Sequence, residues 1–463
     1  MGDQKTYQSP FSWRYGSQQM REIWGEYHTR LLWREIWASL AEVQTEYKLV
    51  TDEQAAEIRS RVEDIDLELS SEVEGNIQHD LMAELEVFAK QCPTAGGTLH
   101  LGATSMDIKD NAVIIQLKVS LKLILEELLQ LLGVLAGLID RWADLPVIGF
   151  THLQPAEPTT LGYRLAQPAQ DLLACYLEFK DLEVNLKGKG FSGAVGTSAS
   201  FATLIGEKNL VDFQSRLAKK LGFEFFDVVT QTYPRIQDYQ VLTSLSGLGA
   251  VLYKMAFDLR ILQSPVYSEL AEPFGENQVG SSAMPFKQNP IKAEKINSLG
   301  RYLAQLPRIA WDNAAHSLLE RTLDDSANRR TILPEAFLAA EEMLHVCSEI
   351  FSDLQVFERG IKQNLDDYGP FAATEKLLMV LTRAGADRQQ MHLVLRKHAL
   401  QAWSAVREGK PNPMVELVSI DPTLLEFISK EEISQAMEGS AYLGDAVERA
   451  TKLSDKIKKE ISG

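Results

Sequence analysis

Cysteine is scarce in this sequence. Among 463 residues only three are cysteines, Cys92, Cys175 and Cys347, and they lie far apart. An odd and scattered set does not form the framework of a disulfide-rich secreted domain, and no CxxC or Cys/His spacing predicts a metal site. Reduced, incidental thiols are the simplest interpretation, and they indicate a reducing compartment such as the cytoplasm.

Long uncharged apolar runs are also missing. The most apolar segment extends over residues 112–139, and its longest uncharged part, residues 128–139, is too short to span a bilayer. Four charged residues interrupt this segment: Lys118, Lys122, Glu126 and Glu127. The N-terminal stretch MGDQKTYQSPFSWRYG contains no apolar core of a signal peptide. We therefore expect a soluble intracellular protein without a membrane partner.

Basic residues are outnumbered by acidic ones. The chain has 47 Lys and Arg against 64 Asp and Glu, a formal net charge of -17. A nucleic-acid or anionic-membrane partner needs a basic face, so this balance argues against both. It does not exclude a small anionic substrate, because a local pocket of Arg, Lys and helix N-termini can bind one.

Clusters of Gly and Pro are rare in the middle of the chain, and the alternation typical of strands is scarce. Over residues 111–140, Lys118, Lys122 and Glu126 recur every four residues and so share one stripe of a helix. Most other positions there are apolar, which predicts a helix buried around most of its circumference. At about 1.5 Å per residue it is roughly 45 Å long, which suggests a bundle that also packs against other subunits.

The rest of the chain is predicted to be helical as well. Further helices are expected at residues 160–187, 236–263, 291–311 and 327–356. The length exceeds what one compact core usually contains. We predict an all-α fold of three helical domains: an N-terminal domain over residues 1–110, a central long-helix bundle over 111–357 and a C-terminal domain over 358–463.

One predicted loop carries residues suited to chemistry. Residues 280–290 read GSSAMPFKQNP, which combines hydroxyls, a Lys and an Asn between two helices. Such a loop can present hydroxyls, backbone N–H groups and an ammonium to an anion, although its composition alone is more typical of a mobile surface loop. The segment is similar to the GSSxMPxKxNP signature of the aspartase/fumarase superfamily. Members of this superfamily cleave C–N or C–O bonds and release fumarate.

Two shorter segments agree with this resemblance. Residues 151–156, THLQPA, are similar to the THxQxA-type region of the superfamily. Residues 100–105, HLGATS, resemble its HxGxTS region. Taken singly, each segment is more typical of a structural His or an ordinary helix cap. Because the three regions occur in the family's order, the chain is identified as a member of the superfamily.

Other segments resemble the adenylosuccinate lyases in particular, and the resemblance covers nearly the whole chain. These segments are Arg14-Tyr15, Gln78-His79-Asp80, Gln231-Thr232-Tyr233 and the run ERTLDDSANRR at residues 320–330. Two positions depart from the family's pattern. Gln78 replaces an Arg, which puts one substrate contact in doubt, and Lys295 keeps a charge but loses the planar geometry of the Arg that some members carry there.

The resemblance implies an elimination by general acid–base catalysis. Ser281 is the implied base, and His152 is the implied acid that protonates the departing nitrogen. Lys287 would stabilise the carboxylate onto which the carbanion charge spreads, and Glu294 would orient His152. The implied substrate-binding residues are Arg14, Tyr15, Gln78, His79, Asp80, His100, Thr104, Ser105, Gln231, Asn289, Lys295, Arg321, Ser326 and Arg330. No metal and no organic cofactor are implied.

The implied substrate is a small anionic nucleotide that carries a succinyl group. Two alternatives stay open: another superfamily lyase such as argininosuccinate lyase, and an inactive structural relative comparable to the crystallins of this superfamily. The resemblance further implies a homotetramer with a common helical core and active sites shared between subunits. If the long central helices run antiparallel in one bundle, the regions around His100, His152 and Ser281 of one chain would end far apart, and sharing would bring them together.

Overall fold

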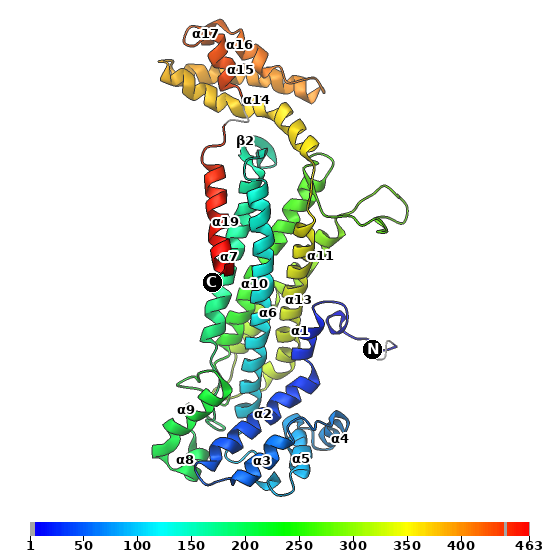
Figure 1. Ribbon diagram of the computed structural model, residues 1–463, viewed down its shortest axis with the longest axis vertical. Helices are drawn as coiled ribbons and strands as arrows, with labels where there is room; N and C mark the ends of the chain where they lie inside the picture. Colours follow the sequence, from blue (N-terminus) through cyan, green and yellow to red (C-terminus); the bar gives the residue numbers. More distant parts are fainter. Residues whose placement is uncertain (1–4, 439–441, 463) are drawn as a thin grey trace. The chain divides into compact units, whose positions relative to one another are not determined.

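The computed structural model describes residues 5–438 and 442–462, and Figure 1 shows the order of their elements. The N-terminal helices are α1 (Gln18–Ile23), α2 (Glu26–Thr45), α3 (Asp52–Ser60), α4 (Leu67–Ile77) and α5 (Asp80–Gln91). The long helices that follow are α6 (Ser105–Arg141), α7 (Leu161–Asn185), α10 (Ile236–Gln263) and α13 (Asp324–Ser352). Between them lie α8 (Ala199–Ile205), α9 (Leu210–Leu221), α11 (Ile291–Leu303) and α12 (Leu306–Ala315).

The C-terminal helices are α14 (Glu358–Arg383), α15 (Arg388–Arg407), α16 (Met414–Ser419), α17 (Pro422–Leu425), α18 (Lys430–Ala436) and α19 (Ala446–Ser462). The strands are β1 (Pro146–Thr151), β2 (Gln154–Thr160), β3 (Leu270–Ala271) and β4 (Gln355–Val356). Short 3₁₀ turns are η1 (Pro10–Ser12), η2 (Gly96–Thr98) and η3 (Glu207–Asn209). The predicted all-α class is confirmed.

The predicted helix boundaries hold best where no proline intervenes. Helix α10 begins and ends at the predicted residues, and α6 begins at Ser105 rather than at residue 111. The single helix predicted over 291–311 is wrong, because the chain forms α11 and then α12 there. Pro307 stands in the first turn of α12, where its missing N–H cannot continue the hydrogen bonding of α11.

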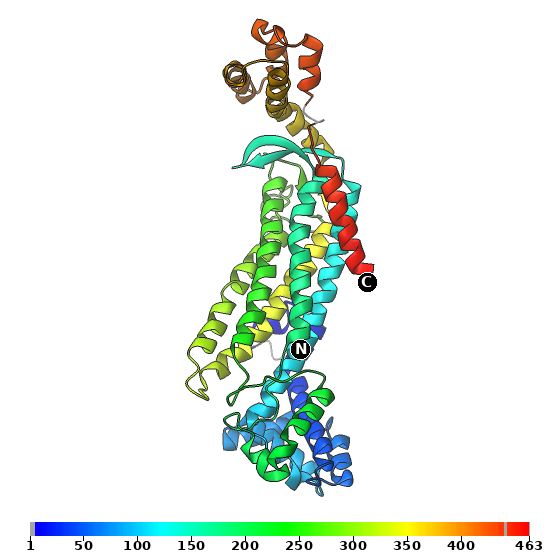
Figure 2. The same cartoon turned by 90° about the vertical axis from the view of Figure 1, so that its left-hand side faces the viewer.

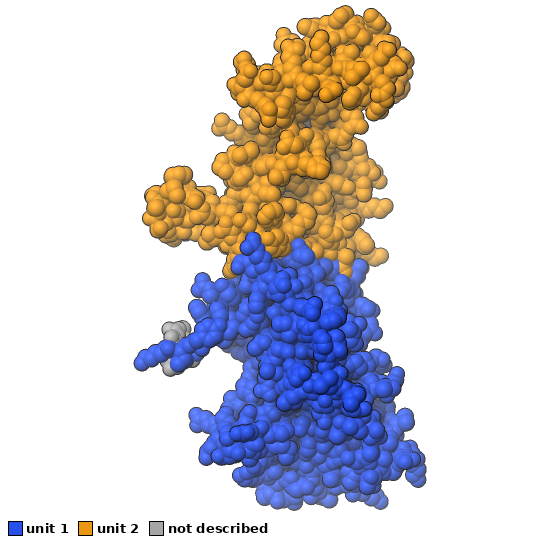
Figure 3. Space-filling view, turned by 180° about the vertical axis from the view of Figure 1, so that it is seen from behind, with its two compact units in different colours: residues 1–127, 175–250, 298–344 blue, residues 128–174, 251–297, 345–463 orange. Residues whose placement is uncertain are grey.

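By its contacts the chain divides into two compact units, which Figure 3 colours separately. Unit 1 contains residues 1–127, 175–250 and 298–344, and unit 2 contains residues 128–174, 251–297 and 345–463. The long helices therefore contribute a section to each unit. The three-domain division expected from the sequence stays a prediction.

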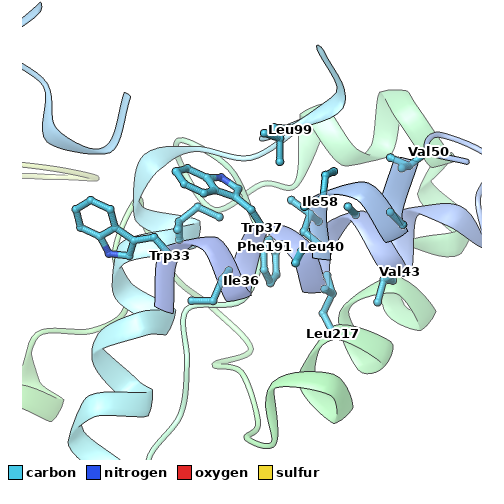
Figure 4. Packing of buried hydrophobic residues seen from close by; sticks show 14 of the residues in the cluster. Trp33, Ile36, Trp37, Leu40, Val43, Val50, Ile58, Leu99, Phe191 and Leu217 are labelled. Carbon is cyan, nitrogen blue, oxygen red and sulfur yellow. The ribbon is translucent and has the colours of Figure 1, made fainter. Parts of the chain in front are cut away.

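Unit 1 is built around α2 and the helices that pack on it. Trp37 of α2, Phe191 after α7 and Leu217 of α9 belong to one buried apolar cluster (Figure 4). Side-chain caps fix where the short helices begin. Thr51 and Gln54 form a reciprocal capping box at α3, with N–H contacts of 3.2 and 3.0 Å.

Unit 2 contains a β-hairpin that sequence reasoning missed. Strand β1 pairs antiparallel with β2, and the register shifts between Ile148 and Phe150 (Figure 2). Gly149 and the prolines of β2, Pro155 and Pro158, hide the alternation that would have predicted strands. In a two-stranded hairpin each strand has a free edge, so these prolines are tolerated.

The C-terminal helices of unit 2 form a second apolar cluster, to which α14, α15, α16 and α18 contribute. Helix α19 runs along α6 and α7 in both views (Figures 1 and 2). Ser454 Oγ donates to the carbonyl of Ala136 at 3.2 Å, and the Arg449 guanidinium lies 5.6 Å from the ring of Tyr163. Across residues 5–438 and 442–462, no helix combines the length and apolarity that crossing a bilayer requires.

Candidate active site

His152 lies in the two-residue turn of the β1–β2 hairpin. Thr151 pairs with Gln154 across the turn, and both turn residues are left-handed, His152 at φ 54° and Leu153 at φ 57°. Two non-glycine residues in this region make the turn strained. The turn is exposed, and the Tyr267 hydroxyl donates to the Leu153 carbonyl at 3.4 Å. The hairpin therefore presents the His152 side chain at its tip.

A buried polar cluster holds the base of this hairpin. Arg164 of α7 forms an ion pair with the fully buried Glu269, and its Nη2 donates to the Ile148 carbonyl at 2.5 Å. Asn364 of α14 donates to Glu269 at 2.9 Å and to the Tyr267 carbonyl at the same distance. These contacts join β1, the segment after α10 and α14, so they restrict where the hairpin can lie.

Ser281 lies in the loop between α10 and α11, which extends away from its helices in Figure 1. Its Oγ accepts hydrogen bonds from the N–H groups of Ala283 at 3.3 Å and Met284 at 3.1 Å. The Asn289 amide donates to the Gly280 carbonyl at 2.7 Å and closes the loop at its base. Lys287 is exposed in the same loop. Two backbone N–H groups directed at one hydroxyl oxygen favour its deprotonated form.

Gly280 is required by the shape of this loop. A Cβ at position 280 would lie 2.0 Å from the Lys287 carbonyl oxygen, a backbone atom that cannot move out of the way by changing rotamer. The close approach of these two backbone segments brings Lys287 and Ser281 into one small loop. Any larger residue at position 280 would open it.

Glu294 lies in the first turn of α11 and is exposed. Its carboxylate is 3.5 Å from Arg260 Nη2 of α10. Glu294 and Leu153, the neighbour of His152, line one pocket of 430 Å³ in unit 2. Lys295 follows Glu294 and is partly buried. The structure therefore places the hairpin turn and the start of α11 at the same pocket.

In unit 1, several implied substrate-binding residues form one polar cluster. Asp80, at the start of α5, pairs with Arg330 of α13 at 2.7 Å and with Lys109 of α6. His79 Nε2 is 3.5 Å from Ser105 Oγ. Burial alone would raise the pKa of Asp80, but the charges of Lys109 and Arg330 and a backbone N–H outweigh burial and lower it to about 2. Asp80 is therefore an anion with a cation at each oxygen.

His100 and Thr104 flank this cluster. The Trp37 indole N–H donates to His100 Nδ1 at 3.0 Å. Burial and the neighbouring His79 lower the pKa of His100 to about 4. His100 is therefore neutral at pH 7, with its proton on Nε2, and it can donate a hydrogen bond without carrying charge. The Thr104 N–H donates to Asp107 at 2.9 Å, which fixes the first turn of α6.

A network of buried ion pairs fixes the segment that carries Arg321. Arg321 donates to Asp325 at 2.7 Å, and Asp325 accepts from Arg235 at 2.7 Å. Arg235 in turn forms two bonds with Asp110 of α6, at 3.0 and 3.1 Å. Asp110, Arg235 and Asp325 are all buried. The position of Arg321 is thus determined by paired charges on three elements.

The same network continues to the segment around Gln231. Arg329 donates to Asp238 at 2.8 Å and to the Tyr233 hydroxyl at 2.7 Å. The Gln231 N–H donates to the Glu320 carbonyl at 3.1 Å, next to Arg321. Two segments that resemble the lyases, around residues 231 and 321, are therefore neighbours in unit 1.

The remaining implied residues of unit 1 lie on other segments. Arg14 is exposed, and its guanidinium carbon is 6.0 Å from the ring of Tyr15. Ser17 donates to Glu341 of α13 through its N–H and Oγ at 2.6 and 2.8 Å, which anchors this N-terminal segment. Ser326 lies in the first turn of α13, between Arg321 and Arg330. Gln78 is exposed and left-handed at the end of α4, with φ 55°.

The structure gathers some implied residues and leaves others apart. His79, Asp80, Ser105 and Arg330 share one cluster. Within the described residues, no hydrogen bond or ion pair joins His152 to Ser281, Lys287 or Glu294, so the implied role of Glu294 stays a prediction. Sequence reasoning missed Lys109, whose spacing of four residues from Ser105 could have placed it on the same helical face.

The described residues also contain no group of three or more His, Cys, Asp or Glu side chains arranged to bind a metal. A larger cavity of 880 Å³ lies beside the hairpin in unit 2, lined by residues of β1, β2, α7, α10 and α14. The polar groups described above can thus bind anions, donate a proton from an imidazole and accept one at a hydroxyl.

Comparisons with known proteins match nearly the whole chain. The family described as "Lyase" matches residues 19–302, and "Adenylosuccinate lyase C-terminus" matches residues 370–453. Adenylosuccinate lyase of Saccharomyces cerevisiae is 37% identical over 98% of this chain and 95% of its own length. The adenylosuccinate lyase of Pyrococcus abyssi is 32% identical over 95% of each chain.

Solved structures share the fold. A fumarate lyase from a Mesorhizobium species superposes with a TM-score of 0.84 at 23% identity, covering 97% of this chain and 99% of that one. A 3-carboxy-cis,cis-muconate lactonizing enzyme from Pseudomonas putida gives 0.86 at 23% identity, covering 98% and 100%. These two proteins are named for different reactions, so the structural likeness shows the fold alone. Information on the substrate comes from the relatives in sequence.

Proposed function

Because this chain belongs to the adenylosuccinate lyase family, we propose that it eliminates fumarate from adenylosuccinate, which gives AMP. We propose the same reaction on SAICAR, the succinyl-carboxamide ribotide of purine biosynthesis, which gives AICAR. The proposal rests on one observation: Ser281 Oγ accepts hydrogen bonds from two backbone N–H groups within the loop that resembles the superfamily signature. A cytoplasmic location stays a prediction.

In the proposed reaction Ser281, as an alkoxide, removes a proton from the succinyl carbon next to the one that carries nitrogen. The carbanion charge spreads onto the adjacent carboxylate, which Lys287 and Asn289 would stabilise. The C–N bond then breaks, and His152 donates a proton to the departing nitrogen. The Ala283 and Met284 N–H groups support the alkoxide of Ser281.

The phosphate and carboxylates of the substrate need cationic and hydrogen-bonding partners. We assign Arg321, Ser326 and Arg330 to one such set because all three lie at the start of α13 or just before it. Arg321 is oriented by Asp325, and a guanidinium presents planar donors that match phosphate geometry. His100 adds a neutral donor at Nε2.

We further propose that the protein acts as a homotetramer whose sites combine residues of different subunits. Helix α10 supports this proposal. Its exposed face carries Ile236, Gln240, Thr243, Gly247, Ala250, Lys254 and Phe257, and only one of these residues is charged. Ile236 is 47% exposed and Phe257 45% exposed. A surface helix normally carries charged residues on its solvent face, so this composition favours burial against another subunit.

The direct test of the activity is release of fumarate. Purified protein is mixed with adenylosuccinate, with SAICAR and with argininosuccinate, and fumarate is measured in each. We expect fumarate from the first two substrates. Fumarate from argininosuccinate alone would overturn the proposal, and no fumarate from any of the three would favour an inactive structural relative.

The roles of the acid and base are tested by Ser281→Ala and His152→Ala. Each should lower kcat by about 10²–10⁴-fold or more while the helical circular-dichroism signal is preserved. Near-normal turnover of Ser281→Ala would assign the base to another residue.

The same two variants test whether sites are shared. Both proteins are dissociated, mixed and reassembled, and the formation of mixed oligomers is verified with a mass tag. Mixed oligomers should recover part of the activity, since some sites would combine an intact His152 with an intact Ser281 from another chain. Mixed oligomers without activity would place both residues in the same chain at each site.

A further inference from the structure

Lys109 is the cation of the Asp80 cluster that sequence reasoning missed. It lies on α6 one helical turn after Ser105, and its side chain is 20% exposed. Its Nζ forms a close ion pair with Asp80 Oδ1 and lies 5.3 Å from the ring of Trp33. The lysine therefore reaches the centre of a cluster whose other members are implied substrate contacts.

The charges of this cluster are unequal. One carboxylate, Asp80, is placed between two cations, with Lys109 at Oδ1 and Arg330 at Oδ2. One positive charge is left in excess. The Arg330 side chain is 62% exposed, so that excess is available to a ligand on the open side. Nearby Arg30 is already paired with Glu26 at 2.8 Å and with Glu74 at 3.2 Å.

The effect of Lys109 follows from the two oxygens of Asp80. Oδ1 also accepts a hydrogen bond from the Leu81 N–H at 2.7 Å, which carries no full charge, so without Lys109 the charge of Asp80 would be balanced, among the described residues, by Arg330 alone. The pair would then be neutral, and Arg330 would lose most of its attraction for an anion. Lys109 prevents this by supplying a second positive charge at Oδ1.

Position 78 explains why this matters in the present chain. Gln78 is exposed, directly precedes His79 and carries no charge. His79 contacts Ser105, so position 78 is the chain neighbour of a residue in this cluster. The chain instead places its additional positive charge on α6, at Lys109.

We propose that Lys109 is a positioning residue that keeps Arg330 free to bind the phosphate of the substrate, and that it replaces the positive charge that Gln78 does not supply. This inference rests on the proposed function, because the ligand is taken to be a phosphorylated nucleotide. The role is one of binding rather than of chemistry. Loss of Lys109 should therefore raise KM and leave kcat nearly unchanged.

The matched control is Lys118, another lysine of α6. Its side chain is 18% exposed and pairs with Glu183 at 3.1 Å, so Lys118→Met removes a comparable ion pair far from Asp80 in the sequence. We expect Lys109→Met to weaken AMP binding about tenfold by calorimetry and to raise KM to a similar degree. Lys118→Met should leave both unchanged. Adenosine, which lacks the phosphate, should bind equally well to wild type and Lys109→Met.

Rescue distinguishes a lost charge from a damaged fold. Gln78→Arg in the Lys109→Met background should recover most of the lost AMP affinity, and Lys109→Arg alone should retain it. Gln78→Arg in the wild-type background should tighten AMP binding about two- to fivefold at low salt, which keeps the proposal testable if Lys109→Met does not fold.

Several outcomes would overturn the inference. Unchanged AMP affinity in Lys109→Met, an equal loss of adenosine affinity, or failure of Gln78→Arg to change AMP binding in either background would each do so. Failure of the proposed function is recognised separately, because it appears as absence of fumarate release by the wild-type protein.

Discussion

Glu127 allows a stability prediction whose sign and size follow from the structure. This residue of α6 is largely enclosed, and its Oε2 has no hydrogen-bond partner among the described residues. Burial, together with the carboxylates of Glu341 and Glu342, raises the pKa of Glu127 to about 8. The folded chain thus retains a proton that the unfolded chain begins to release near pH 4.5.

A carboxyl whose pKa is raised by folding destabilises the folded chain as pH rises. For Glu127, the free energy of unfolding is highest below pH 4.5 and falls as the pH rises, and the loss is complete above a pH of about 8. Linkage assigns about 5 kcal/mol to a difference of this size. Because Glu127 retains some exposure, we expect about 2–3 kcal/mol after screening by solvent. The substitution Glu127→Gln keeps the shape of the side chain and removes this loss.

Thermal unfolding followed by circular dichroism measures the effect at a fixed protein concentration and at about pH 5, 7 and 8.5. Glu127→Gln should raise Tm by about 2–5 °C at the highest pH and by almost nothing at the lowest. The exposed neighbour provides the control, since Glu126→Gln should change Tm little at any pH. A gain that does not grow with pH, or an equal gain in Glu126→Gln, would refute the reasoning.

Three further predictions concern residues in and beside the candidate active site. His100→Asn keeps a hydrogen-bond acceptor for Trp37 and suits the φ of 62°. Protonation of His100 should cost the wild type about 2 kcal/mol of unfolding free energy as the pH falls from 6.5 to about 4, and the variant should not show this loss. Unfolding measured at both pH limits checks this. Leu153→Gly should relieve about 1 kcal/mol of left-handed strain and raise Tm slightly; an unchanged or lower Tm would contradict the strain assigned to this turn. Gly280→Ala should lower kcat by about 10²-fold or more while Tm is preserved, because the new Cβ would collide with the Lys287 carbonyl and displace the loop. Normal turnover would show that the loop accommodates the Cβ.

The helices could be predicted from the sequence because their signal is local. Lys118, Lys122 and Glu126 recur every four residues, and in the structure Lys122 and Glu126 are exposed and Lys118 is partly exposed, while Leu117, Leu121 and Leu128 are fully buried. Pro307 shows the opposite case. It divides the predicted 291–311 helix, although the apolar pattern continues on both sides of it.

The site could be predicted only where motifs mark it. The motif around Ser281 identifies the loop, but the Ala283 and Met284 N–H groups that surround its hydroxyl depend on loop conformation. The hairpin that carries His152 has no strand signal, because Gly149 and two prolines hide the alternation. Its base is held by Arg164, which lies on another segment and pairs with Glu269. Contacts between residues far apart in sequence are decided by packing, which the local pattern does not encode.

The buried ion-pair network of unit 1 has a consequence for how this protein can change over time. Arg235 pairs with both Asp110 and Asp325, and Arg321 and Arg329 supply further positive charge, so replacing one member unbalances the charge of the interior, typically a loss of about 3–5 kcal/mol. Drift at these positions therefore requires compensating changes on other segments at nearly the same time. The network residues of α6, of α13 and of the segment before α10 are thus expected to change together rather than singly.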